Sequence, residues 1–138
     1  MVNILDMKDI MYLNLFSKIT RVNTRFCFMY NDNVIFAVPR NLISKAVGEN
    51  GRNVKKLNEV LRKKIKIIPI PHGIEQAREF IYAVISPTTF KGLEVTENEI
   101  IINAGSQNKA ALIGRNKRRF LELQIIIKDF FKKELKII

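Results

Sequence analysis

The chain has 138 residues, enough for one ordinary domain or two very small ones, and its 47% hydrophobic and 27% charged residues exclude a disordered protein. Its 24 Lys and Arg residues against 13 Asp and Glu residues give a net charge of +11. This charge favours a polyanionic partner, either a nucleic acid or an anionic membrane surface.

Single cysteine and histidine residues narrow the possible chemistry. One cysteine excludes an intramolecular disulfide. One cysteine and one histidine together are too few ligands for a Cys-rich or His-rich metal site, so we expect no metal and no cofactor. No apolar run approaches the roughly 18 residues that a membrane span needs, and the first residues lack the layout of a signal peptide. We therefore expect a soluble, monomeric, cytoplasmic protein.

The first half of the chain predicts three helices and three strands. Apolar spacing of three and four residues indicates helices, while runs of β-branched and aromatic residues bounded by turn residues indicate strands. Asp32 and Asn33 are typical of a turn between two strands. The predicted elements are, in chain order, a helix at 6–18, strands at 24–31 and 34–38, helices at 42–47 and 52–62, and a strand at 65–68.

The second half predicts the same order of elements. Its elements are a helix at 74–84, strands at 90–95 and 100–102, helices at 110–113 and 120–130, and a strand at 135–138. The two halves align at an offset of 66, which grows to 70 at the last strand, so the last helix should be about one turn longer in the second half. The chain is therefore predicted to be an α+β protein of two domains, 1–69 and 70–138, each with the order α-β-β-α-α-β.

A glycine-containing turn separates the last two helices of each half. The first glycine turn is residues 48–51, Gly-Glu-Asn-Gly, and the second is residues 114–117, Gly-Arg-Asn-Lys. Glycine lets the backbone approach a ligand closely, and the following helix directs its unpaired N–H groups and positive dipole end at the same space. One such turn could equally be a plain helix connection beside a solvated basic helix. Its recurrence in a chain of charge +11 favours phosphate binding.

The order of elements and the stretch from Ala46 to Leu57 resemble a KH domain of the prokaryotic (type II) arrangement. Two such domains on a short linker are similar to the KH pair of the NusA family of transcription elongation and termination factors, in its short archaeal form. The resemblance implies two tandem type II KH domains, whose glycine turns each hold about four nucleotides of single-stranded RNA. Lys117 departs from the pattern, because it stands where the second glycine of the turn is expected. Its Cβ could hinder close approach of RNA, or its ammonium could supply a charge contact.

The sequence thus predicts a non-enzymatic, single-stranded RNA-binding factor in transcription termination or antitermination, with RNA polymerase as a further partner. The alternatives are a ribosome-associated or RNA-processing protein, a module that docks on polymerase through its last helix, and a phosphate-handling enzyme, for which no catalytic set can be assembled. The candidate RNA-binding residues are Lys45, Gly48, Glu49, Asn50, Gly51, Arg52, Asn53, Lys55, Lys56, Gly114, Arg115, Asn116, Lys117, Arg118 and Arg119.

Three further expectations concern apolar residues. Cys27 lies in an apolar predicted strand and should be a core residue rather than a nucleophile. Phe130 and Phe131 should also belong to the core. The run Ile125-Ile126-Ile127 makes the last long helix apolar on more than one face, which indicates either deeper burial or a protein interface.

Overall fold

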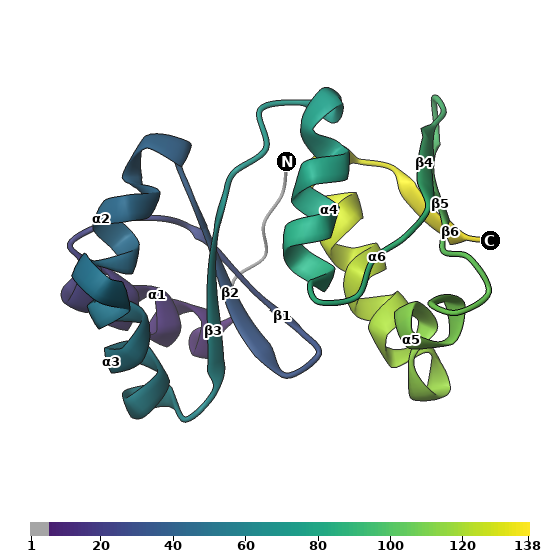
Figure 1. Cartoon of the computed structure of the whole chain (residues 1–138). Helices are drawn as coiled ribbons and strands as arrows, with labels where there is room; N and C mark the ends of the chain where they lie inside the picture. Colours follow the sequence, from purple (N-terminus) through teal and green to yellow (C-terminus); the bar gives the residue numbers. More distant parts are fainter. Residues whose placement is uncertain (1–5) are drawn as a thin grey trace. The chain divides into compact units, whose positions relative to one another are not determined.

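The computed structural model describes residues 6–138, and the chain divides after Ile70 into two compact units. Each unit has the order α-β-β-α-α-β and a three-stranded sheet, with the helices on one side of the sheet (Figure 1). In each sheet the first two strands are antiparallel, and the last strand runs parallel to the middle one. The α+β fold class and the repeated order of elements are confirmed.

The first unit has its sheet in the order β1-β2-β3. Its elements are α1 Met7–Thr20, β1 Phe26–Tyr30, β2 Asn33–Val38, α2 Ile43–Val47, α3 Arg52–Leu61 and β3 Lys64–Pro69, with short 3-10 turns at Arg40–Leu42 and Glu49–Gly51. The turn between β1 and β2 was predicted one residue too late. Asn31 and Asp32 both have positive φ and form it, because Asn33 already pairs with Tyr30.

The core of the first unit lies between α1 and the sheet. The rings of Phe16 and Phe36 stack with centroids 4.3 Å apart, and both are fully buried. Cys27 is buried in the same cluster, as predicted. Helix α1 begins with a capping box, in which the Asp6 carboxylate accepts from the Asp9 N–H at 2.8 Å and Asp9 accepts in return. The cap fixes the start of the helix that supplies Phe16.

The second unit has its sheet in the order β4-β5-β6. Its elements are α4 Ala77–Ile85, β4 Gly92–Val95, β5 Glu99–Asn103, α5 Lys109–Ile113, α6 Arg118–Phe131 and β6 Glu134–Ile137, with 3-10 turns at Ile74–Gln76 and Arg115–Lys117. Strand β4 begins two residues later than predicted. Phe90 precedes it and stacks on Tyr82, with ring centroids 4.1 Å apart.

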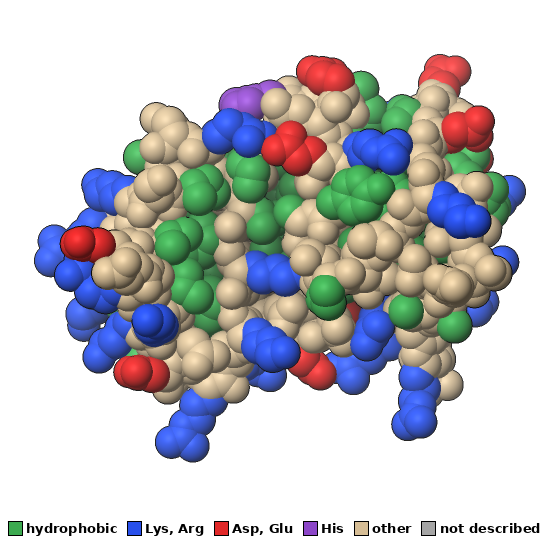
Figure 2. Space-filling model, in the orientation of Figure 1, with side chains coloured by type: hydrophobic (Ala, Val, Ile, Leu, Met, Phe, Trp, Pro, Cys, Tyr) green, Lys and Arg blue, Asp and Glu red, His purple; other side chains and the backbone are tan. Residues whose placement is uncertain are grey.

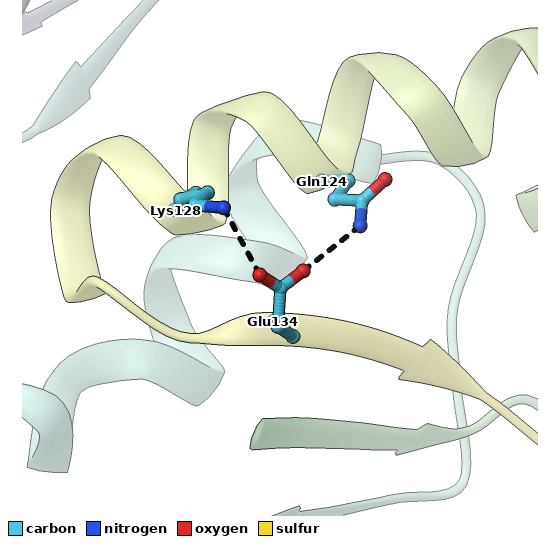
Figure 3. Close-up of polar contacts among 3 residues, drawn as sticks. All are labelled: Gln124, Lys128 and Glu134. Atoms are coloured by element: carbon cyan, nitrogen blue, oxygen red, sulfur yellow. Dashed lines mark hydrogen bonds and ion pairs between the residues drawn. The ribbon is translucent and has the colours of Figure 1, made fainter. Parts of the chain in front are cut away.

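The predicted extra turn of the last helix is present, since α6 has 14 residues and α3 has 10. Glu134, the first residue of β6, ties this longer helix to its strand (Figure 3). Its carboxylate accepts from Gln124 Nε2 at 3.1 Å and from Lys128 Nζ at 3.0 Å. These two hydrogen bonds lower the pKa of Glu134. Lys128 is therefore engaged within the chain.

The apolar expectations for α6 hold in part. Ile126 and Ile127 are buried, whereas 71% of Ile125 is exposed. Phe130 and Phe131 are half-buried, and both rings contact Phe80 of α4, at centroid distances of 4.7 and 5.8 Å. The helix thus buries one broad face and presents an apolar residue on the other.

Candidate nucleic-acid interface

The two glycine turns have the same backbone conformation. Gly48 and Gly114, which open them, have φ/ψ of 81°/164° and 77°/170°. Asn50 and Asn116 follow in the left-handed region, at 56°/27° and 57°/29°. The last residues, Gly51 and Lys117, also match, at 72°/20° and 60°/22°. The repeat is therefore one of geometry as well as of sequence.

The first glycine of each turn is required by the packing of the protein itself. A Cβ at Gly48 would lie 2.9 Å from the side-chain amide of Asn53 and 3.1 Å from its backbone nitrogen. A Cβ at Gly114 would lie 2.9 Å from Arg119 Cγ and 3.0 Å from the Arg119 backbone nitrogen. Both glycines let the turn close against the start of the following helix.

The last residue of each turn stands in a different environment. A Cβ at Gly51 would meet no atom within 4 Å, so its positive φ, and not crowding within the protein, favours glycine there. Lys117 occupies the equivalent place with an exposed side chain and keeps the left-handed backbone. The second turn therefore forms without its second glycine, and the cost is local backbone strain.

Asn53 and Arg119, both candidate RNA-binding residues, form the same bond within the protein. Asn53 Nδ2 donates to the carbonyl of Lys45 at 3.2 Å, and Arg119 Nη1 donates to the carbonyl of Ala111 at 3.0 Å. Each bond links the helix after the turn to a carbonyl of the short helix before it, which satisfies an acceptor that a helix end leaves open. Sequence reasoning missed this structural role, because an amide and a guanidinium share no motif.

The first glycine turn and α3 enclose a shallow surface depression of about 360 Å³. We call it the first depression. It brings together five of the candidate residues and adds Glu59, which sequence reasoning did not select; its lining is Glu49, Asn50, Arg52, Lys55, Lys56 and Glu59. Three cations against two carboxylates leave it basic. Figure 2 shows Lys and Arg side chains gathered on this side of the first unit.

The second glycine turn and α6 enclose a corresponding second depression of about 490 Å³. It includes the candidate residues Arg115, Asn116 and Arg118, and its complete lining is Arg115, Asn116, Arg118, Leu121, Glu122 and Ile125. Lys117 is exposed beside it, and Lys45 is exposed on α2 of the first unit. Each depression is open and shallow, a shape that suits an extended strand more than a small enclosed ligand.

Other chemistry receives no support from the described residues. Burial raises the pKa of the Cys27 thiol to about 12, so the nucleophilic thiolate is strongly disfavoured. Within residues 6–138, no three His, Cys, Asp or Glu side chains are grouped to hold a metal ion. No helix in that part of the chain is both long and apolar enough to cross a membrane.

Comparison with known proteins yields similarity to archaeal transcription proteins, while no family model matches the chain. Proteins called probable transcription termination protein NusA share 32% identity over 81 residues (Methanococcus vannielii), 24% over 127 (Halococcus morrhuae) and 31% over 80 (Methanocaldococcus jannaschii). These matches cover 59%, 86% and 58% of this chain, and 47%, 89% and 42% of the relatives. The chain thus spans less than half the length of the two methanogen proteins. The resemblance to archaeal NusA predicted from the sequence is confirmed.

A solved structure supports the fold independently. The crystal structure of a protein designated APE1850 matches with a TM-score of 0.66 at 22% identity, covering 97% of this chain and all of that one. At an identity this low, the match supports the fold and not a shared function.

Proposed function

We propose that this chain is a single-stranded RNA-binding factor that acts on nascent transcripts, and that its two units are type II KH domains. The names of its relatives support a role in transcription termination. In this proposal the chain is a non-enzymatic protein that works beside RNA polymerase. Its first glycine turn is the main contact to the RNA backbone, and its second turn is an auxiliary one.

The recurrence of one unusual turn conformation at the start of a helix carries the proposal. A helix start offers N–H groups without intrahelical partners and the positive end of a dipole, which together favour a phosphate. In the first unit Arg52, Lys55 and Lys56 add positive charge around the same depression. The open space beside Gly51 leaves room for an RNA backbone to approach the protein backbone.

An added negative charge in the first turn tests the proposal. Glu49→Asp combined with Asn50→Asp adds one negative charge, because only position 50 changes its charge. Both side chains are exposed, and Asp tolerates the left-handed backbone that Asn50 adopts. We expect the affinity for a fluorescent single-stranded RNA to fall about tenfold, equivalent to about 1.4 kcal/mol, with little change in melting temperature.

The matched control is Asn98→Asp, which adds the same charge at an exposed position in the β4–β5 turn. It should leave RNA affinity nearly unchanged. Equal affinity of the double variant and the unchanged protein would remove the first glycine turn from the binding site. Equal losses of RNA affinity in the double variant and the control would show that only the net charge of the protein matters.

A further inference from the structure

The first and second depressions are built from equivalent positions. Every lining residue of the first has its counterpart in the second exactly one repeat offset, 66 residues, further along the chain. The pairs are Glu49 and Arg115, Asn50 and Asn116, Arg52 and Arg118, Lys55 and Leu121, Lys56 and Glu122, and Glu59 and Ile125. The two turns also share their backbone angles. The two depressions therefore have the same backbone geometry and differ only in their side chains.

The helix positions of the second depression offer fewer cations to a phosphate than those of the first. Where the first depression has the adjacent cations Lys55 and Lys56, the second has Leu121 and Glu122. A carboxylate in place of an ammonium repels an RNA backbone. Leu121 and Ile125 themselves supply neither a charge for a phosphate nor an aromatic ring on which a base could stack.

The same substitutions create a small apolar anchor site. Leu121 and Ile125 stand one turn apart on α6, with 51% and 71% of their surfaces exposed. An apolar pair at this spacing is what an amphipathic helix of a partner contacts when it lies along another helix. Burying this water-exposed aliphatic surface against such a partner contributes favourably to the free energy of binding.

The charge beside this anchor selects the kind of partner. Arg115 lines this depression, Lys117 follows two residues later in the same turn, and both side chains are exposed. A second copy of this chain would bring the same cations against them, and the net charge of +11 adds to that repulsion. A helical segment with apolar residues along one face and acidic residues at one end would complement both the apolar pair and the cations beside it.

We propose that the second depression docks an acidic amphipathic helix of a protein partner. The two units then differ in their main partner: the first depression makes most of the phosphate contacts, and the second binds protein through Leu121 and Ile125 while its turn keeps an auxiliary contact to RNA. This proposal does not depend on the chain's binding RNA, because it rests on Leu121, Ile125 and the charges beside them.

A reciprocal exchange of side chains tests the proposal. A display library of random helical peptides is selected on the full chain alone, and the selected peptides are then measured on the variant Leu121→Lys, Glu122→Lys, Ile125→Glu, which carries the α3 side chains of the first depression at these three positions. We expect the selected peptides to combine spaced apolar residues with acidic ones, and to bind the variant at least about tenfold more weakly by fluorescence anisotropy. The reverse variant, Glu49→Arg, Lys55→Leu, Lys56→Glu, Glu59→Ile, which also receives the counterpart of Arg115, should gain affinity for the same peptides.

The exchanged positions are surface-facing, and circular dichroism of each variant verifies that the fold is kept. Peptides that bind the unchanged chain and the first variant equally well would overturn the proposal, as would selected peptides without acidic residues. RNA binding is measured separately on Leu121→Ala, Ile125→Ala. A loss there as large as that from Lys55→Ala, Lys56→Ala would make the second depression a seat for RNA instead. A chain that binds the peptides but no RNA would refute the proposed function alone.

Discussion

The glycines of the two turns differ in what they do. Gly48 and Gly114 admit the following helix, because a Cβ would press against its backbone nitrogen. Gly51 has open space around it and only a left-handed backbone to adopt. A G-x-x-G pattern thus joins one residue needed for folding with one that leaves a surface accessible to a ligand.

Alanine substitutions should separate these roles. Gly48→Ala combines a close contact to Asn53 with φ/ψ of 81°/164°, a region that few residues other than glycine adopt, and should cost about 2–4 kcal/mol of stability. Gly51→Ala costs only the left-handed conformation, about 1–2 kcal/mol. Urea denaturation followed by circular dichroism measures both. The reverse order would mean that the turn relaxes freely around residue 48.

Lys117 offers the opposite substitution. It holds φ of 60° with a side chain that costs about 1–2 kcal/mol there, against about 0.4–1 kcal/mol that glycine loses through its more flexible unfolded state. Lys117→Gly should therefore stabilise the protein by roughly 0.5–1 kcal/mol. The same denaturation assay tests it, with Lys55→Gly inside α3 as a control that should destabilise. A destabilised Lys117→Gly protein would indicate that the lysine side chain stabilises the turn.

At the level of helices and strands, periodicity predicted the type and order of every α-helix and strand of the described residues, because buried faces repeat every two or 3.6 residues, but not the short 3-10 turns before α2, α3, α4 and α6. The β1–β2 turn was misplaced by one residue, since Asn and Asp suit either position of such a turn. The bonds from Asn53 to Lys45 and from Arg119 to Ala111 could not be predicted. They depend on how two helices meet across the turn, which spacing along the chain does not specify.

The candidate site was predicted unevenly for a related reason. The glycine turns and the basic residues after them stand out in the sequence, and they do line the depressions. Glu59 and Leu121 were missed, whereas the run at 125–127 had already indicated a second apolar face of α6 at Ile125. Glu59 and Leu121 lie one to two turns along their helices from the glycine turn, where only the orientation of the helix shows which residues share its surface.

Strand β1 provides a reporter for the first unit. Cys27 is the only cysteine, it is buried, and its pKa is raised to about 12, so the folded protein should react very slowly with iodoacetamide at pH 8. Phe36→Ala removes the ring that stacks on Phe16 and should cost about 3–5 kcal/mol, so labelling should accelerate strongly. Mass spectrometry of the alkylated protein follows the rate. Fast labelling of the unchanged protein would show that β1 opens without global unfolding.

Across the whole molecule, charge is distributed unequally between the halves. Residues 1–69 hold 13 basic and 5 acidic residues, net +8, and residues 70–138 hold 11 and 8, net +3. The first half also has the turn with both glycines, and its depression has three cations where the second has two. Long-range attraction and local phosphate contacts should therefore both favour the first unit as the principal RNA site.

Salt dependence measures this asymmetry. Each phosphate neutralised on a single strand contributes about −0.7 to the slope of log affinity against log salt. Lys55→Ala, Lys56→Ala removes two exposed cations of the first depression and should flatten the slope by about 1–1.5. The matched variant of the second unit is Arg115→Ala, Arg118→Ala, which spares Arg119 because that residue bonds to Ala111.

The second variant should flatten the slope by less than about 0.7, since the second depression lacks the adjacent lysines and Glu122 opposes a phosphate there. Titration of fluorescent single-stranded RNA at several salt concentrations compares both variants with the unchanged chain. A larger loss from the arginine pair would reverse the ranking of the two units and make the second turn the principal phosphate site. Three equal slopes would place the RNA backbone away from both helices, and the basic surface of the first unit would then act only through its long-range field.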